Sequence, residues 1–165
     1  MAQTASLATT KVNSLLIAPE GLPAALSLIA DLSGIQLPAF QPSHVIAQNV
    51  APDLVERSHV NKYPTVHIYC SKVKNTLREK FRTFSGEIEM VAEIRVSQDR
   101  LDGLEILVQC YTDAVTQVLD SSRGDWGEGL FYAGGYEINY GPVKHGGQNF
   151  LQIAKITFTV DLSSN

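Results

Sequence analysis

Charged residues are scarce in this sequence, above all in its first third. They make up 18% of the 165 residues, against about 25% in typical soluble domains, and those before Asp53 are Lys11, Glu20 and Asp31. A hydrophobic content of 44% excludes a disordered chain, and the length fits one domain with a real core. We therefore expect much of the almost uncharged segment 1–52 to be covered by the sheet, by an adjacent subunit or by a neighbouring ring.

Cysteine and long apolar runs are also nearly lacking. Cys70 and Cys110 are too few for a disulfide framework and have no metal-ligand spacing, which predicts reduced thiols in an intracellular protein. The first 21 residues hold an apolar run of only four residues before Pro19, which predicts neither a signal peptide nor a membrane span. We expect a soluble, unsecreted protein with no membrane partner.

Motifs for catalysis, cofactors and metals are missing as well. The net charge of −4 argues against a general nucleic-acid binder. No cysteine or serine lies in a nucleophile-elbow motif, and the glycines of residues 124–129 do not match a phosphate loop. The histidines are scattered without a ligand pattern at His44, His59, His67 and His145. The sequence predicts no enzyme, no cofactor and no metal site.

Hydrophobic periodicity divides the chain into helices and strands. The expected order is a helix at 20–34, a Pro-rich extended arm at 35–52, a strand at 63–70, a basic loop at 71–82, a strand at 84–97, a helix at 99–123, a glycine-rich turn at 124–129, a strand at 130–140, a turn at 141–149 and a strand at 150–162. This order predicts a single α+β domain. We expect this domain to consist of a mainly antiparallel four-stranded sheet with two helices packed on one face, preceded by an N-terminal extended arm. Residues 1–52 would form the helix and arm, and residues 53–165 the α+β unit.

The strand at residues 84–97 has the clearest pattern in the chain. Its alternate positions are apolar or glycine, which predicts a half-buried strand whose other face is exposed. That face carries Glu87, Glu89 and Glu93. Neighbours two apart on a strand lie about 6.6 Å apart, a spacing that acid–base catalysis can use, but ordinary exposed charge is the favoured interpretation.

Two segments carry opposite charge. The loop at 71–82 has five bases against Glu79, namely Lys72, Lys74, Arg78, Lys80 and Arg82. The helical region at 99–125 is acidic, through residues that include Asp102, Glu105, Asp113 and Asp120. Copies arranged head to tail could pair these segments as subunit interfaces around a closed ring. A solvated loop and a DNA contact remain alternatives for the basic segment.

From residue 63 onwards the chain resembles the tail terminator and neck proteins of tailed bacteriophages. The resemblance rests on the Pro-containing strand YPTVHIYC, the basic loop, the long strand followed by VSQDRLDGLEILVQCYTDAVTQVL, and the closing KITFTVDL. It has no counterpart for the Pro-rich segment before Tyr63.

The resemblance implies a virion protein of the tail or neck, assembled in the host cytoplasm. Such a protein is usually a homohexameric ring that caps the tail tube, joins it to head-completion proteins and leaves a lumen for DNA. It also implies that the basic residues lie on a protruding loop and that Lys144 and His145 lie on the other hairpin tip, as partner or lumen contacts.

Three functions are thus open: a tail terminator ring, a head-completion or other neck ring of the same machine, and a small enzyme or ligand-binding domain whose site is assembled from residues distant in sequence.

Overall fold

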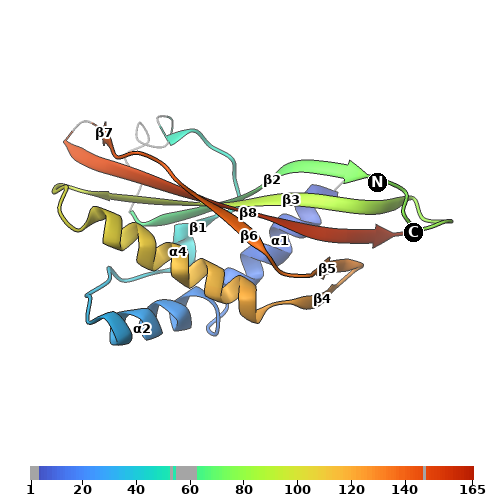
Figure 1. Cartoon of the computed structure of the whole chain (residues 1–165), viewed down its shortest axis with the longest axis horizontal. Helices are drawn as coiled ribbons and strands as arrows, with labels where there is room; N and C mark the ends of the chain where they lie inside the picture. The colour runs from blue at the N-terminus through green and yellow to red at the C-terminus, as the bar shows by residue number, and fades with distance from the viewer. Residues whose placement is uncertain (1–3, 53, 55–62, 147) are drawn as a thin grey trace.

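The computed structural model describes residues 4–52, 54, 63–146 and 148–165, and in it the helices lie on one side of a long sheet (Figure 1). The helices are α1 (Thr4–Ile17), α2 (Leu22–Ser33), the short 3-10 helix η1 (Pro42–His44) and α4 (Leu104–Ser121). The strands are β1 (Val45–Ile46), β2 (Thr65–Asn75), β3 (Phe84–Gln98), β4 (Gly124–Gly127), β5 (Leu130–Tyr132), β6 (Tyr136–Tyr140), β7 (Lys144–Gly146) and β8 (Asn149–Ser164).

The sheet is built around the two longest strands, β3 and β8. Its order is β1-β2-β3-β8-β5-β4, and β6 and β7 also pair with β8. β1 is parallel to β2, whereas the other pairs are antiparallel. Along the edge of β8 that faces away from β3, the short strands β5, β6 and β7 follow one another, opposite Leu162, Ile156 and Leu151 respectively.

The expected four-stranded, two-helix architecture is therefore wrong. The described residues form an eight-stranded mixed sheet and three α-helices. The strand expected at 130–140 is broken at Gly134 and Gly135, whose φ angles of 97° and 91° suit glycine, so that β5 and β6 are separate strands. The two expected turns at 124–129 and 141–149 contain β4 and β7, and the expected arm contributes η1 and the parallel strand β1.

Two element boundaries also differ from expectation. β2 continues to Asn75, so Lys72 and Lys74 lie on a strand and not in a loop. α4 begins at Leu104 rather than near Asp99, because Gly103 precedes it in a left-handed conformation with φ of 80°. The stop of α2 at Gly34, in contrast, is confirmed: Gly34 is left-handed and donates its backbone N–H to the carbonyl oxygen of Ala30.

The helix α1 was not expected, and it covers part of the sheet. Its buried residues Ala8, Val12 and Leu16 recur every four positions and form one stripe that faces β2 and β3. α4 packs against β3 and β8, while α2 packs mainly on α4. The helices thus form two layers beneath the sheet, with α2 farthest from it (Figure 1).

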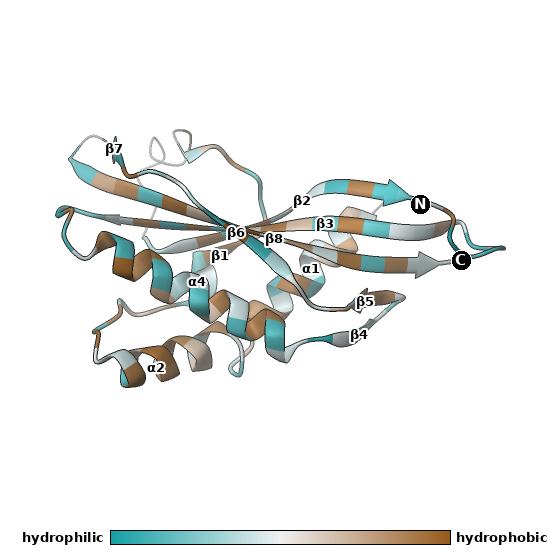
Figure 2. Cartoon of the chain, in the orientation of Figure 1, coloured by the Kyte–Doolittle hydropathy of each residue, from teal (hydrophilic) through white to brown (hydrophobic). Residues whose placement is uncertain are grey.

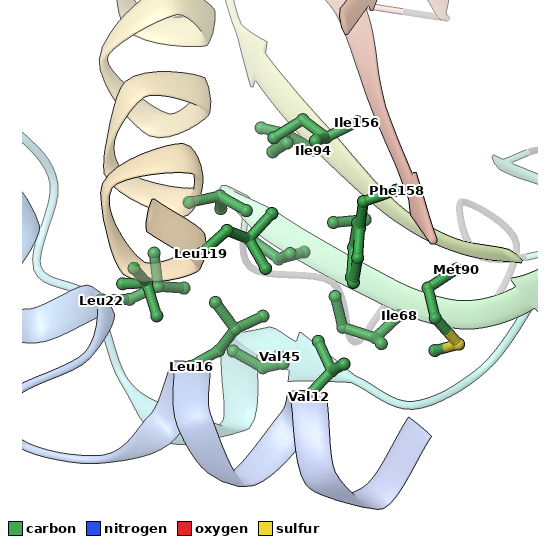
Figure 3. Packing of buried hydrophobic residues seen from close by; sticks show 14 of the residues in the cluster. Val12, Leu16, Leu22, Val45, Ile68, Met90, Ile94, Leu119, Ile156 and Phe158 are labelled. Carbon is green, nitrogen blue, oxygen red and sulfur yellow. The ribbon is translucent and has the colours of Figure 1, made fainter. Parts of the chain in front are cut away.

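The core lies between the sheet and these helices. Figure 3 shows Val12 and Leu16 of α1 and Leu119 of α4 facing Ile68, Met90 and Phe158 of the sheet. Apolar and polar bands alternate along the long strands in Figure 2, and the seven expected inward positions of β3 are all buried. The predicted inward face of this strand is confirmed.

Among the described residues, no single helix is long and apolar enough to cross a membrane. α1 and α2 together meet that criterion by length and composition alone, as a pair bent by 44°.

Candidate functional site

The second face of the sheet, away from the helices, carries a buried charged cluster. Glu93 and Arg95 of β3 are only 4% and 1% exposed, so the expectation that Glu93 lies on an exposed strand face is wrong. The segment that follows β1 lies against this face, because the backbone oxygen of Val50 accepts a hydrogen bond from Nη2 of Arg95. Glu87 and Glu89, nearer the other end of β3, are half-buried.

Three neighbouring strands provide partners for the Glu93 carboxylate. Its Oε1 accepts a hydrogen bond from Nε of Arg95 at 2.7 Å. Its Oε2 accepts one from the hydroxyl of Tyr69 on β2 at 3.1 Å and lies 3.3 Å from Nζ of Lys155 on β8. The strand register explains the meeting, because Glu93 is opposite His67 on one side and Lys155 on the other.

These contacts determine the ionisation of the cluster. Burial acts to raise the pKa of Glu93, but the charges of Arg95 and Lys155 and the hydrogen bonds from Arg95 and Tyr69 outweigh it and lower the pKa below its ordinary value. Burial, followed by the nearby negative charge of Glu93, raises the pKa of Tyr69 to about 12. At neutral pH Glu93 is therefore an ionised, fully engaged acceptor and a poor general acid.

Two buried nitrogen atoms of the cluster have no hydrogen-bond partner among the described residues. They are Nη1 of Arg95 and Nε2 of His67. The Nδ1 of His67 lies 3.3 Å from the carbonyl oxygen of Gln48, and burial together with the charge of Arg95 lowers the pKa of this histidine, which keeps it neutral at pH 7.

A cavity of about 410 Å³ opens beside this cluster, within the usual size range of about 300–1,000 Å³ for small-molecule sites. Its charged and amide side chains are Asn49, Glu93, Arg95, Asn139, Lys144 and Lys155. Its other lining comes from residues 50–52 and 140–142 and from Leu151 and Ile153. The cavity therefore combines one carboxylate, three cations and apolar walls. No group of His, Cys, Asp or Glu side chains in the described part of the chain could hold a metal ion.

The five bases expected on one loop lie at one end of the sheet, but acids from other strands accompany them. Lys72 and Lys74 are opposite Glu89 and Glu87 of β3. In the tip loop, defined here as residues 76–83, Arg78 forms ion pairs with Glu87 and with Asp161 of β8. Arg82 pairs with Glu79 at 3.2 Å, and Lys80 is exposed. Much of the positive charge counted along the sequence is thus balanced within the fold.

The tip loop also exposes two large apolar side chains. Leu77 is 61% exposed and Phe81 100% exposed. Both have positive φ angles, 48° and 66°, which are unfavourable for such residues. The position of the loop is nevertheless stabilised by contacts with the sheet. Arg78 forms ion pairs with β3 and β8, and Oδ1 of Asn75 accepts hydrogen bonds from the backbone N–H groups of Leu77 and Ser85.

Lys144 and His145 lie far from the tip loop. They belong to β7, which pairs with the start of β8, and the His145 ring packs edge-on against Phe150 with ring centroids 5.3 Å apart. β7 and the tip loop occupy opposite ends of the sheet (Figure 1). Because β3 has 15 residues, the two ends are roughly 46 Å apart at about 3.3 Å per residue.

The four acids expected at a subunit interface lie on or near the outer face of α4. Asp102 precedes the helix, and all four side chains are exposed: Asp102, Glu105, Asp113 and Asp120. Partial burial raises the pKa of Asp113. Asp120 is already engaged, since it accepts hydrogen bonds from Arg123 and from the hydroxyl of Tyr136.

Sequence reasoning did not find the Glu93–Arg95 cluster. The alternation of β3 places both residues on its polar face, but the covering segment at 48–52 is uncharged and has no pattern that assigns it to that face. No protein-family model matches the chain, and no curated protein matches it significantly.

Proposed function

We propose that this chain is the ring-forming subunit of a tailed-bacteriophage tail terminator, or of a related head-completion or neck ring, with a lumen through which DNA passes. The observation that carries the proposal is the length of the sheet relative to its helical layer. α4 has 18 residues and spans about 27 Å at 1.5 Å per residue. The β3–β8 pair is roughly 20 Å longer at 3.3 Å per residue, and its end with the tip loop projects beyond α4 (Figure 1).

This shape suits a connector that contacts different neighbours at its two ends. The tip loop presents Leu77 and Phe81 at one end, and β7 presents Lys144 and His145 at the other. The exposed acids of α4 lie between these ends. Since ion pairs within the fold neutralise part of the basic end, we assign the principal contact at the tip to its apolar side chains and a lesser one to charge pairing.

Among the described residues, the edge of β2 beyond its short pairing with β1 has no strand partner, and it is an unsuitable surface for pairing with another strand. β1 pairs only with Val66 and His67, and the continuation of β2 carries Lys72, Lys74 and a register shift between Cys70 and Lys72. Lysines and bulges are features that protect sheet edges from such pairing. The ring proposal therefore relies on side-chain contacts rather than on a continuous intersubunit sheet.

The oligomeric state tests this proposal. Size-exclusion chromatography with light scattering is expected to show a homo-oligomer, with a mass about six times that of the 18.0 kDa chain, alone or when phage tail tubes are added. A species that stays at the monomer mass under both conditions would contradict it. Electron cryomicroscopy of the parent particle would then distinguish the terminator position from a head-completion position by its level along the tail axis.

The tip loop provides a more specific prediction. Phe81→Asn should leave the unfolding midpoint unchanged or slightly higher, because asparagine tolerates a left-handed backbone better than phenylalanine. It should weaken ring formation or tail joining by about 30-fold, the effect of removing a 2 kcal/mol aromatic contact. Light scattering over a series of protein concentrations measures ring formation, and tail-joining assays measure tail joining.

Glu128→Asn is the matched control, because Glu128 is also exposed with a positive φ of 54°, at another hairpin. If the Phe81→Asn variant assembles at the same protein concentration as the wild type, the tip loop is not part of the interface.

A further inference from the structure

The cavity on the second face of the sheet has the features of a ligand site and is not needed for the proposed ring contacts. It lies between the 49–52 segment and the β6–β7 connection, with Glu93, Arg95 and Lys155 from the central strands at its base. The tip loop and α4 contribute no residue to its lining. Its function can therefore be tested in the isolated chain, whether or not the chain forms a ring.

Positive charge exceeds negative charge in this cavity. Arg95, Lys144 and Lys155 line it, against the single carboxylate of Glu93. Arg95 is buried, whereas the side chain of Lys155 is 52% exposed and Lys144 is exposed at the rim. The described lining carries a net charge of about +2 at neutral pH, which favours an anionic ligand.

The guanidinium of Arg95 is positioned but incompletely bonded. Its Nε is bonded to Glu93 and its Nη2 to the carbonyl oxygen of Val50, while Nη1 has no partner among the described residues. A buried donor without an acceptor is costly, and native structures rarely leave one so. Because two nitrogens are held in place, the third is preorganised for an acceptor from outside the described residues.

The rest of the lining is largely apolar. Val50, Pro52, Pro142, Leu151 and Ile153 form the walls. A small inorganic anion such as phosphate would leave these walls uncovered. A single carboxylate with an attached apolar group matches both parts of the cavity.

We propose that this cavity binds a carboxylate carried on a short apolar group, with the carboxylate oxygens accepting hydrogen bonds from Arg95 and Lys155. Two sources share this chemistry: a free aliphatic acid, and the C-terminal carboxylate of a peptide chain that ends in an apolar residue. In either case the apolar group lies against Leu151 and Ile153.

The test is a titration of the full chain with hexanoate, followed by isothermal calorimetry and by amide chemical shifts of residues 49–52 and 139–144. Hexan-1-ol is the uncharged comparison. N-acetyl-Ala-Ala-Leu and its C-terminal amide represent the peptide source. Saturable binding of hexanoate or of the peptide acid is expected, together with at least tenfold weaker binding of the alcohol and the amide, because a hydrogen bond between charged groups is lost.

Three variants locate the binding. Lys155→Gln should lower the affinity about tenfold without unfolding the chain, since Lys155 is half exposed and Glu93 keeps Arg95 and Tyr69. Ala51→Trp, at an exposed position that lines the cavity, should abolish binding by filling it. Lys72→Gln is the matched control, an exposed strand lysine outside the cavity, and should bind as the wild type does.

The proposal is overturned if neither acid binds saturably, if hexan-1-ol binds as tightly as hexanoate, or if inorganic phosphate displaces the acid with higher affinity. Wild-type affinity in both Lys155→Gln and Ala51→Trp would overturn it as well. Tighter binding of the peptide acid than of hexanoate would identify a chain end as the ligand, and the reverse order would identify a free acid.

Discussion

Replacing Glu93 with glutamine is expected to lower the free energy of unfolding by about 3–5 kcal/mol at pH 7, the cost of leaving a buried charge without its partner. Arg95 is 1% exposed and remains charged, and the amide cannot neutralise it. Lys155, the other cation near Glu93, is half exposed and regains water when the ion pair is lost. Urea denaturation of the wild type and variant, followed by circular dichroism, measures the difference.

Two further variants give this prediction its controls. Glu89→Gln, four residues away on the same strand face, should cost less than about 1 kcal/mol, because Glu89 is only half-buried and the glutamine oxygen can still accept the hydrogen bond from Ser71. The double variant Glu93→Met, Arg95→Met removes both buried charges and should be more stable than Glu93→Gln alone. Equal stability of Glu93→Gln and the wild type would show that the cluster does not stabilise the fold.

The same carboxylate predicts a pH dependence. Because the contacts of Glu93 lower its pKa in the folded chain below its ordinary value of 4.5, its ionised form stabilises the fold above that value. This contribution is lost as the pH falls from about 4.5 through the lowered folded-state pKa. The difference in unfolding free energy between wild type and Glu93→Gln should therefore be largest near neutral pH and shrink below pH 4.5. A difference that grows on acidification would contradict the assignment.

Ile88→Asp is expected to unfold the chain altogether. Ile88 of β3 is completely buried, and β3 lies between β2 and β8. An unpaired carboxylate there costs several kcal/mol in desolvation, in addition to the lost apolar contacts. This sum is comparable with the whole stability of a domain, about 5–15 kcal/mol.

Val73→Asp is the control for this substitution. Val73 is directly opposite Ile88 on the neighbouring strand but is 44% exposed, so its carboxylate remains in water and the fold should survive. Far-ultraviolet circular dichroism and amide proton shift dispersion distinguish the two results. A soluble Ile88→Asp variant that unfolds cooperatively would show that this face of β3 is not the core.

Elements whose pattern is strong and local were predictable. The alternation of β3, the apolar stripe of α4 and the end of α2 at Gly34 all appear in the structure close to where their residues place them. In these segments the same residues that define the period also bury against the core, so local pattern and tertiary packing agree.

α1 was not predicted because its buried stripe is short and five of its other eleven positions are threonine or serine, which favour no single structure strongly. β4 and β7 are three or four residues long. They are strands because β5 and β8 provide hydrogen-bond partners, and neither segment has a period of its own. The scarcity of charge in residues 1–52 has a partial explanation in α1, whose apolar stripe lies against the sheet.

The charged residues show most clearly which features follow from the sequence and which follow only from the tertiary structure. The sequence by itself determined that β3 has one apolar and one polar face, and that bases accumulate near residues 72–82 and acids near 99–125. Only the tertiary structure decided that Arg78 is neutralised by Glu87 and Asp161, and that Glu93 and Arg95 are buried beside a cavity. Electrostatic energy depends on distance and on access to water, and strand register and covering segments determine both between residues remote in the chain.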